Sequence, residues 1–444
     1  MRRLRARFAL AVLAIMVAGC ASLPPEEAVV INNKSLWEQD VMPSKGLEQK
    51  AVGLTSKSTL HDYLLYAALN NPGLKAAFLK WKAALEKIPQ VTALPDPRFT
   101  YGYFIQIMMN QHQSFALEQT FPWFGKLKLQ GDAAAEAARA EKARYDAAKL
   151  KLFYEVKEAY YEYYYLAQAI AVTKENLGYV KYLESVARTG YASGMIDYAD
   201  VVRAQVELGK LEDSLKTLDD GAEPVAARLN AALNRPPDAP LFWPEKIKEE
   251  KAAFTSKQLL EWLKEYNPEL KALGFEAAGA KWQIARARKD YYPDLTLGMQ
   301  GVDMIQGKDA IVAMATVNLP VWRSKYRAEV REAAANYESL LGQRSDRRNT
   351  LGADVKLAEY KYRDAERKIA LYRGALIPEA KQAIDVSLQA YQTGKEGYTA
   401  VVDAIRNLLE FELSYERAIT DREQRLAELE MLVGRAVTVG GRGD

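Results

Sequence analysis

The sequence predicts a mainly α-helical fold with a small β part, built from two tandem copies of one long unit. Short motifs recur at a near-constant distance: Asn71-Pro72 returns as Asn267-Pro268, and Pro95-Asp96 returns 198 residues later as Pro293-Asp294 (293 − 95). Between the motifs run long tracts rich in Ala, Glu, Lys, Arg and Leu, a composition typical of long antiparallel coiled-coil helices. A near-constant offset across separated motifs indicates tandem duplication of a whole structural unit.

Two further repeated motifs define the extent of the copies. Thr120-Phe121-Pro122-Trp123 corresponds to Asn318-Leu319-Pro320-Val321, and Tyr191-Ala192-Ser193-Gly194 corresponds to Tyr391-Gln392-Thr393-Gly394. We expect each copy to contain a helix, a strand hairpin and two long helices. The expected bounds are 59–234 for the first copy, 235–255 for a proline-rich linker, 256–433 for the second copy and 434–444 for a disordered tail.

The helices of each copy are expected to break at proline and glycine. A first helix should run from Thr59 to about Ile88 with a bend at Asn71-Pro72, because proline disfavours helical geometry in the residue before it. A proline-free tract then predicts one helix from Lys126 to Arg188. After a turn at 189–196 a second should cover 197–234, and the second copy should repeat the pair over 324–392 and 397–433. The expected weak points are Gly178 and Gly374, with kinks at Pro224 and Pro378.

Alternating residues predict strand hairpins at 99–121 and 294–319. In the first strand, expected over 99–108, Phe99, Tyr101 and Tyr103 share one face. Turns are expected at 110–113 and 306–309. The strands, of about 8 to 11 residues, approach the length that tilted strands need to cross a membrane. Open strand edges are not viable in lipid, so transmembrane hairpins would have to be pooled from several chains. Two soluble amphipathic hairpins are the alternative.

The N-terminus predicts export and lipidation. Residues 1–19 combine four arginines with a short apolar stretch, the pattern of a secretory signal that is too short to span a bilayer. Val17-Ala18-Gly19-Cys20 resembles a bacterial lipobox, which implies cleavage before Cys20 and its lipidation, and Ala21 favours the outer membrane. Removal of four arginines takes the formal charge from +3 to about −1 (3 − 4), so no nucleic-acid partner is expected. Residues 20–58 are predicted to be an extended arm.

The residue inventory argues against several classes of function. One cysteine and two histidines exclude a disulfide within the chain and a His-rich metal centre. The sequence contains no Gly-rich phosphate loop, nucleophile elbow or paired metal-ligand motif. We therefore expect no catalytic residue, no metal site and no cofactor.

The order and doubling of these features resemble the TolC-type outer-membrane efflux family. The resemblance covers about residues 59–433 and rests on the lipobox, the Pro-Asp pair before each hairpin, the Phe121–Lys126 motif after the first and the Tyr-x-x-Gly turns. It implies a homotrimer whose chains pool their strands into a 12-stranded outer-membrane β-barrel and their long helices into a 12-helix periplasmic tunnel. It also implies a passive duct that receives substrate from an inner-membrane pump through a periplasmic adaptor.

The resemblance places a gate at the helix turns furthest from the barrel. Counted from the turn glycines Gly194 and Gly394, the matching positions are Asp200, Arg203 and Asp403, whereas Ala400 departs from the paired acids usual in the second copy. Three Asp403 carboxylates around an axis would attract cations, and Arg203 could pair with Asp403 as a latch. The turns themselves would dock the adaptor. The alternative is that these charges are ordinary solvated helix-surface groups.

Other classes of function compete with a duct. A periplasmic adaptor or a structural coiled-coil lipoprotein would share the anchor and the helices. The substrate stays open between a metal cation and a drug or other small molecule. Met108, Met109 and His112 at the first hairpin tip suggest a soft-metal contact, but methionines at a membrane interface are usually apolar filler.

Overall fold

The computed structural model describes residues 54–105, 111–244, 247, 252–306 and 308–437. The described residues, from Leu54 onward, belong to one compact unit. The predicted signal peptide, Cys20 and the arm up to Gly53 lie outside the described residues. In the part of the chain that is described, no helix combines the length and apolar character needed to cross a membrane.

Each copy begins with two short helices joined at an Asn-Pro step. Helices α3 (Leu60–Asn70) and α4 (Pro72–Thr92) take the place of the single bent helix expected to end near Ile88. Asn71 caps α4, because its Oδ1 accepts the N–H of Leu74 at 2.9 Å. In the second copy α8 (Ser256–Tyr266) and α9 (Pro268–Lys289) repeat this arrangement. An Asn cap followed by proline at the first helical position favours a new helix start, so the chain breaks instead of bending.

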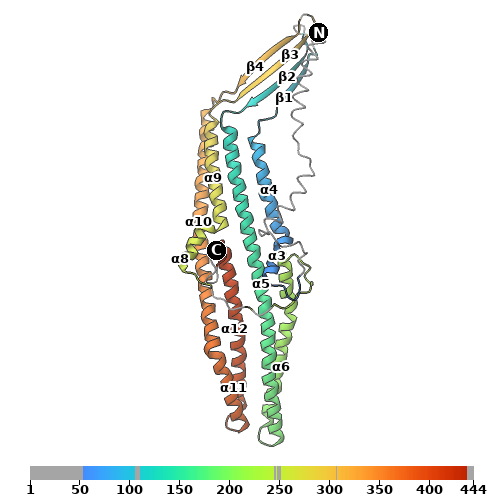
Figure 1. The fold of residues 1–444 in the computed structure, drawn as a ribbon, viewed down its shortest axis with the longest axis vertical. Helices are drawn as coiled ribbons and strands as arrows, with labels where there is room; N and C mark the ends of the chain where they lie inside the picture. Colours follow the sequence, from blue (N-terminus) through green and yellow to red (C-terminus); the bar gives the residue numbers. More distant parts are fainter. Residues whose placement is uncertain (1–53, 106–110, 245–246, 248–251, 307, 438–444) are drawn as a thin grey trace. The chain divides into compact units, whose positions relative to one another are not determined.

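Four antiparallel strands form one sheet in sequence order (Figure 1). The first strand ends at Tyr103 instead of Met108, and the turn predicted at 110–113 is wrong, because residues from Gln111 onward are already strand. The strand bounds are β1 Arg98–Tyr103, β2 Gln111–Phe121, β3 Leu295–Met304 and β4 Ala310–Val317. Strand β2 is longer than its hairpin partner β1 because it also pairs with β3, where Gln111 lies opposite Met304.

The two faces of the sheet differ in polarity. In each pairing the register places odd-numbered residues opposite odd-numbered ones along the central part of the sheet. The odd-numbered face is mainly apolar. Phe115 and Leu117 on it are partly buried, but most of its large side chains are 39% to 58% exposed: Phe99, Tyr101, Tyr103, Phe121, Leu295, Leu297, Met299, Ile311 and Val317. The even-numbered face carries most of the small and polar residues, with Thr120 Oγ1 lying 2.9 Å from Thr296 Oγ1, but it also includes Val302, Met304, Val312 and Met314. The apolar face of this sheet thus lies open instead of covering a core.

A buried ion cluster joins the two copies where the sheet meets the helices. Lys126 Nζ, on a side chain only 9% exposed, lies 2.9 Å from Asp294 Oδ1 and 3.2 Å from Asp290 Oδ1. The same Asp294 oxygen accepts the backbone N–H of Trp123 at 2.7 Å, and the Trp123 ring stacks on Tyr292 at 5.1 Å. Burial opposes the charge, but the hydrogen bonds with both aspartates raise the pKa of Lys126 above its usual value.

The long helices of the first copy follow directly. Helix α5 (Lys126–Ala192) has 67 residues, which corresponds to about 100 Å. The helix expected over 197–234 is divided into α6 (Tyr198–Asp220) and α7 (Ala222–Ala232). The break falls at Gly221, three residues before Pro224, because glycine is a poor helix former and proline cannot donate a hydrogen bond to the preceding turn.

The long helices of the second copy contain a local irregularity at the expected kink. Helix α10 (Arg323–Leu371) passes through a π-helical turn, Tyr372–Leu376, into α11 (Ile377–Gln392), and α12 (Tyr398–Val433) follows. The ring of Pro378 would clash with the carbonyl of Gly374 in a regular α-helix, and the wider turn accommodates it. The predicted helix over 324–392 therefore continues but is not regular.

The helices pack into several cores along their length. Helix α9 packs against both α5 and α10, and α12 packs against α5 and α10. Figure 1 shows the two long helix pairs, α5 with α6 and α11 with α12, each ending in a turn at the end away from the sheet. The tail expected to be disordered from 434 is ordered through Val437, which is 3% exposed and packs against α8 and α10 residues.

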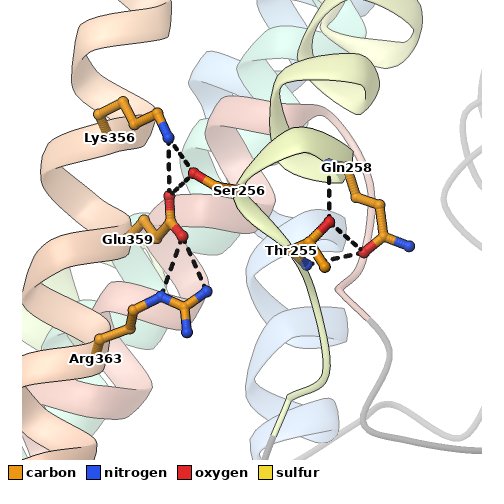
Figure 2. A network of polar contacts seen from close by, with 6 residues as sticks. All are labelled: Thr255, Ser256, Gln258, Lys356, Glu359 and Arg363. Atoms are coloured by element: carbon orange, nitrogen blue, oxygen red, sulfur yellow. Dashed lines mark hydrogen bonds and ion pairs between the residues drawn. The ribbon is translucent and has the colours of Figure 1, made fainter.

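A polar network fixes the start of the second copy on the long helix beside it (Figure 2). Glu359 of α10 accepts hydrogen bonds from Ser256 Oγ at 2.5 Å and from Nε and Nη2 of Arg363 at 3.1 and 3.0 Å. Lys356 also donates to Ser256 and lies 3.5 Å from the same carboxylate. Burial opposes the charge, but these donors together hold the pKa of Glu359 below its usual value. The network anchors the first turn of α8 to α10.

Candidate functional site at the helix turns

The two long-helix turns have the same backbone geometry. Gly194 and Gly394 adopt left-handed φ angles of 76° and 70°. Each donates its N–H at 3.0 Å to the carbonyl of the tyrosine three residues before it, Tyr191 or Tyr391. A glycine in this conformation at the end of a helix satisfies terminal carbonyl groups without a Cβ penalty. The repeated Tyr-x-x-Gly motif therefore encodes a helix-ending turn.

Replacing a turn glycine by alanine should destabilise that turn by about 1 to 2 kcal/mol, because a left-handed φ is unfavourable for any residue with a Cβ. We expect Gly394→Ala to accelerate amide hydrogen exchange in residues 389–396. Gly178→Ala is the matched control: Gly178 lies inside α5, and nothing beyond its own stretch of helix comes within 4 Å of the place that a Cβ would occupy. That change should stabilise the helix by up to about 1 kcal/mol. Equal effects at both sites would contradict the assignment of the turn.

The four helices that lead to these turns share one apolar core. Leu183 of α5, Ala204 of α6, Ile384 of α11 and Val401 of α12 belong to the same buried cluster. The equivalent tyrosines of the two copies differ in environment, although each pair is in ring contact. In the second copy Tyr391 and Tyr398 are buried, whereas in the first copy Tyr191 and Tyr198 are half or more exposed: Tyr391 4%, Tyr398 5%, Tyr191 50% and Tyr198 59%.

The predicted gate residues take different positions. Asp200 is largely buried, accepts a hydrogen bond from Tyr391 Oη at 3.4 Å and lies 3.2 Å from Arg203 Nη1. Asp403 is 59% exposed and lies 3.7 Å from Arg406 on its own helix. Burial, with the Asp200 carboxylate beside it, raises the pKa of Tyr391. The hydroxyl therefore stays protonated and able to donate at neutral pH.

The predicted latch between Arg203 and Asp403 is not formed within this chain, where both residues are described and each has a partner on its own helix. An ion pair that does join the copies near the turns is Glu207 of α6 with Arg406 of α12. Arg406 Nε and Nη2 donate to Glu207 Oε1 and Oε2 at 2.8 and 2.5 Å. Neither this pair nor the contact of Tyr391 with Asp200 was predicted. A signal for the pair was present in the sequence, because Glu207 and Arg406 carry opposite charges and follow their turn glycines at similar distances.

Acid should release the Glu207–Arg406 link. The hydrogen bonds from Arg406 are the main cause of the lowered pKa of Glu207, and partial burial opposes them. A carboxylate with a depressed pKa stabilises the fold fully above its unfolded value, near 4.5, and loses that contribution as the pH falls through the folded value. With Arg406 half exposed, the link is worth no more than about 1 kcal/mol.

This acid sensitivity can be measured by hydrogen exchange in α6 and α12. At pH 7 we expect Glu207→Gln to increase exchange up to about fivefold, and the difference from wild type should vanish near pH 3. Glu212→Gln, which removes a mostly exposed carboxylate 4.0 Å from Lys181, is the control and should change little. A Glu207→Gln effect that persists unchanged at pH 3 would contradict the assignment.

A groove lies between the two turns. It has a volume of about 620 Å³, and its lining comes from the end of α5, the first turn, and the end of α11 with the second turn: Ser185, Val186, Thr189, Gly190, Met195, Ile196, Tyr391, Gln392, Thr393 and Gly394. Backbone, hydroxyl and apolar groups dominate this lining, so the groove suits a protein segment better than a charged small molecule. The structure thus brings Gly194 and Gly394, the predicted docking positions, to the same end of the helix bundle.

Several predicted features lie elsewhere or outside the described residues. Cys20, Met108 and Met109 are not among the residues that the structure describes. His112 Nδ1 lies 3.5 Å from Asp303 Oδ2 at the end of the sheet. Within the described ranges, no group of three or more His, Cys, Asp or Glu side chains is arranged to hold a metal ion.

Comparison with known proteins agrees with this architecture. A relative named toxin and drug export protein A, from Aggregatibacter actinomycetemcomitans, is 23% identical over 299 residues. That alignment covers 65% of each chain, so it spans less than two thirds of the relative's length. Among solved structures, the outer membrane protein VceC of Vibrio cholerae matches with a TM-score of 0.72 at 17% identity, over 85% of this chain and 97% of that one. The open state of the outer membrane channel MtrE of Neisseria gonorrhoeae matches with a TM-score of 0.69 at 18% identity, over 88% and 98%.

Both repeats of the sequence match the same protein family. The family described as outer membrane efflux protein matches residues 64–235 and 259–435. These two ranges correspond to the two repeats defined by the turns, the strands and the long helices. Because the match covers most of the chain, the protein belongs to the outer membrane efflux protein family.

Proposed function

We propose that this protein is the outer-membrane channel of a tripartite efflux pump. It would conduct substrate passively from an inner-membrane transporter, through the periplasm, to the exterior, and it would perform no catalysis itself. The single observation that carries the proposal is a four-stranded sheet with an exposed apolar face and two open edge strands, continued by helices of up to 67 residues. Membership of the family supports it and disfavours the adaptor and the structural lipoprotein.

The sheet argues for assembly into a homotrimer. Strands β1 and β4 are the edges of the sheet, and each has one side without a strand partner among the described residues. In lipid, unsatisfied backbone groups cost several kcal/mol each, so a membrane-inserted sheet must close on itself. Three chains would contribute 3 × 4 = 12 strands and close a barrel, with the apolar face toward lipid and the Thr-rich face toward the lumen.

The charges near the turns support a gate at the periplasmic end. Asp403 is well exposed beyond the second turn, and three copies around an axis would form an acidic ring that favours cations. The Tyr391–Asp200 and Glu207–Arg406 contacts hold the helix pairs of the two copies together, so breaking them is the natural route to opening. Arg203, paired to Asp200, limits the negative charge at the first copy.

The remaining parts of the proposal concern anchoring and partners. Cys20 would carry the lipid that holds the protein in the outer membrane, because several buried acyl chains anchor a protein firmly. The groove between the turns would receive the adaptor, with Gly194 and Gly394 fixing the shape of the tips. The pump would select the substrate, because a wide water-filled duct needs no specific pocket.

Single-channel conductance in planar bilayers tests the proposal. We expect discrete, cation-selective steps from the purified wild-type protein and a lower cation selectivity for Asp403→Ala. Asp219→Ala removes the same charge from α6, about 20 residues after that helix begins, and serves as the control. If the conductance steps and their selectivity are unchanged in Asp403→Ala, the channel proposal stands but Asp403 is not part of the gate. If neither the wild-type protein nor a variant lacking both turns conducts ions, the structural lipoprotein is favoured instead.

A further inference from the structure

The two edge strands of the sheet are the unmatched members of a repeated pattern. Strand β1 is the first strand of copy one, and β4 is the second strand of copy two. Between them, β2, the second strand of copy one, pairs with β3, the first strand of copy two. The internal pairing of β2 with β3 is therefore a template for whatever joins β4 to a β1 strand.

The two hairpins have the same register. Phe99 lies opposite Leu117 in the first hairpin, and Leu297 lies opposite Ala315 in the second. Both members of the pair have moved by 198 residues (297 − 99 and 315 − 117). The same displacement converts every pair of β1 with β2 into a pair of β3 with β4. The duplication has thus kept the strand register as well as the sequence motifs.

This displacement defines the missing pairing. In the internal pairing Glu118 lies opposite Gly298. Moving the β2 residue forward and the β3 residue back by 198 gives Thr316 (118 + 198) opposite Thr100 (298 − 198). We propose that β4 pairs antiparallel with β1 of a second copy of this chain, with Thr316 directly opposite Thr100 of the partner subunit. The proposal rests on the trimeric channel proposed above and specifies its intersubunit register.

The register is consistent with the polarity of the sheet. It places Val317 opposite Phe99 of the partner subunit and Ala315 opposite Tyr101 of the partner subunit, which keeps the exposed apolar faces of the two sheets continuous. A slip of one residue would place each apolar side chain on the polar face of its neighbour, because side chains alternate along a strand. Both edges are open to such a partner: Phe99, Tyr101 and Val317 are each at least 51% exposed, and Thr100 and Thr316 are exposed.

The join between subunits should depend on this strand pairing more than the internal join does. At the internal join Lys126 is buried between Asp290 and Asp294. The position that corresponds to Lys126 in the second copy is Ser324 (126 + 198), which has no charge. The buried ion cluster is therefore not repeated between subunits, so this ionic contribution to the internal join is absent there.

Cysteine cross-linking tests the register. The variant carrying Thr100→Cys and Thr316→Cys should form intersubunit disulfides on mild oxidation, because directly opposed antiparallel residues have Cα atoms about 4.5 to 5.5 Å apart, within disulfide range. The variant carrying Thr100→Cys and Met314→Cys is displaced by two residues on the same face. Its diagonal pair is about 7 to 8 Å apart, so we expect at least about tenfold less cross-linking. The two single-cysteine variants, each of which retains Cys20, should give no covalent trimer.

The outcomes separate the register from the channel. The mass of each variant in detergent is measured before oxidation, and cross-links are then counted on denaturing, non-reducing gels. A covalent trimer formed by the Thr100/Thr316 pair above the displaced pair supports the register. A trimer that cross-links better through the displaced pair, or through neither, overturns the register while leaving the channel standing. A protein that stays monomeric in detergent and in lipid overturns both.

Discussion

Met299→Arg should prevent stable insertion of the sheet into a membrane. Met299 lies in the middle of β3 on the exposed apolar face, opposite Leu117 on one side and Ala313 on the other. An arginine on the lipid face of a barrel near the bilayer midplane costs about 2 to 4 kcal/mol. In a trimer each subunit incurs this cost, so we expect the yield of membrane-inserted trimer to fall at least about tenfold. The measurement is the fraction of protein recovered as trimer from the outer membrane.

The neighbouring residue provides the matched control for this change. Gln300 lies next to Met299 in β3 but on the opposite face, paired with Ala116 and Val312. Gln300→Arg adds the same charge to the face that we propose lines the lumen, where water would solvate it, and should leave the trimer yield near that of wild type. Equal losses for Met299→Arg and Gln300→Arg would contradict the assignment of the apolar face to lipid and favour soluble hairpins.

Lys126→Met should destabilise the junction between sheet and helices by about 3 to 5 kcal/mol. Removing one partner of a buried ion pair leaves the other charges buried without compensation, which is far more costly than the pair's net contribution. Here Asp290 and Asp294 would both lose the Lys126 ammonium. Asp290 would keep Arg286 at 4.0 Å, and Asp294, which is 30% exposed, would keep the Trp123 N–H, so we expect a loss at the lower end of this range. The readout is the free energy of unfolding from denaturant titration of the detergent-solubilised protein.

Two comparisons isolate the role of the ammonium group. Lys128→Met, two residues further along α5 and exposed, should change the free energy of unfolding by less than about 0.5 kcal/mol. The raised pKa of Lys126 means that its contribution is complete below the ordinary lysine value, 10.5, and is lost only as the pH rises through the folded value. The Lys126→Met deficit should therefore be constant from pH 6 to pH 9. A deficit that disappears within that range would show that the ammonium is not its cause.

Local sequence signals were sufficient for the order and type of the elements. The Asn-Pro steps, the two alternating hairpins and the Tyr-x-x-Gly turns each act through short-range chemistry: an N-cap, a side-chain period of two, and a left-handed glycine. The element order could therefore be predicted, as could the fold class. Two errors, the unbroken helices expected across Asn71-Pro72 and across Gly221, underestimated local breaking signals. The others fell where a neighbour in space decides the outcome. Strand β2 is longer than expected because β3 pairs with it, and the tail is ordered through Val437 because α8 and α10 residues pack against it.

The candidate site shows the same division. The family resemblance pointed to Asp200, Arg203 and Asp403 as gate positions, which stays a prediction, and the one pairing expected among them, Arg203 with Asp403, is not formed within this chain. The structure pairs Asp200 with Tyr391 and replaces the expected latch by Glu207 with Arg406, contacts between side chains some 190 to 200 residues apart in the chain. Which of several charges on a helix meets a given partner depends on helix rotation and axial offset, and both are fixed by packing of the shared apolar core.

Repeated motifs, together with local backbone and side-chain preferences, were enough to establish the duplication, the class of each element and the family. The register between the two hairpins, the burial of Lys126 between two aspartates, and the contrast between the buried Tyr391 and the exposed Tyr191 became evident only in the packed structure. The physical reason is that burial and pairing are properties of the neighbours in space. Two copies with the same motif therefore acquire different environments once they pack against each other.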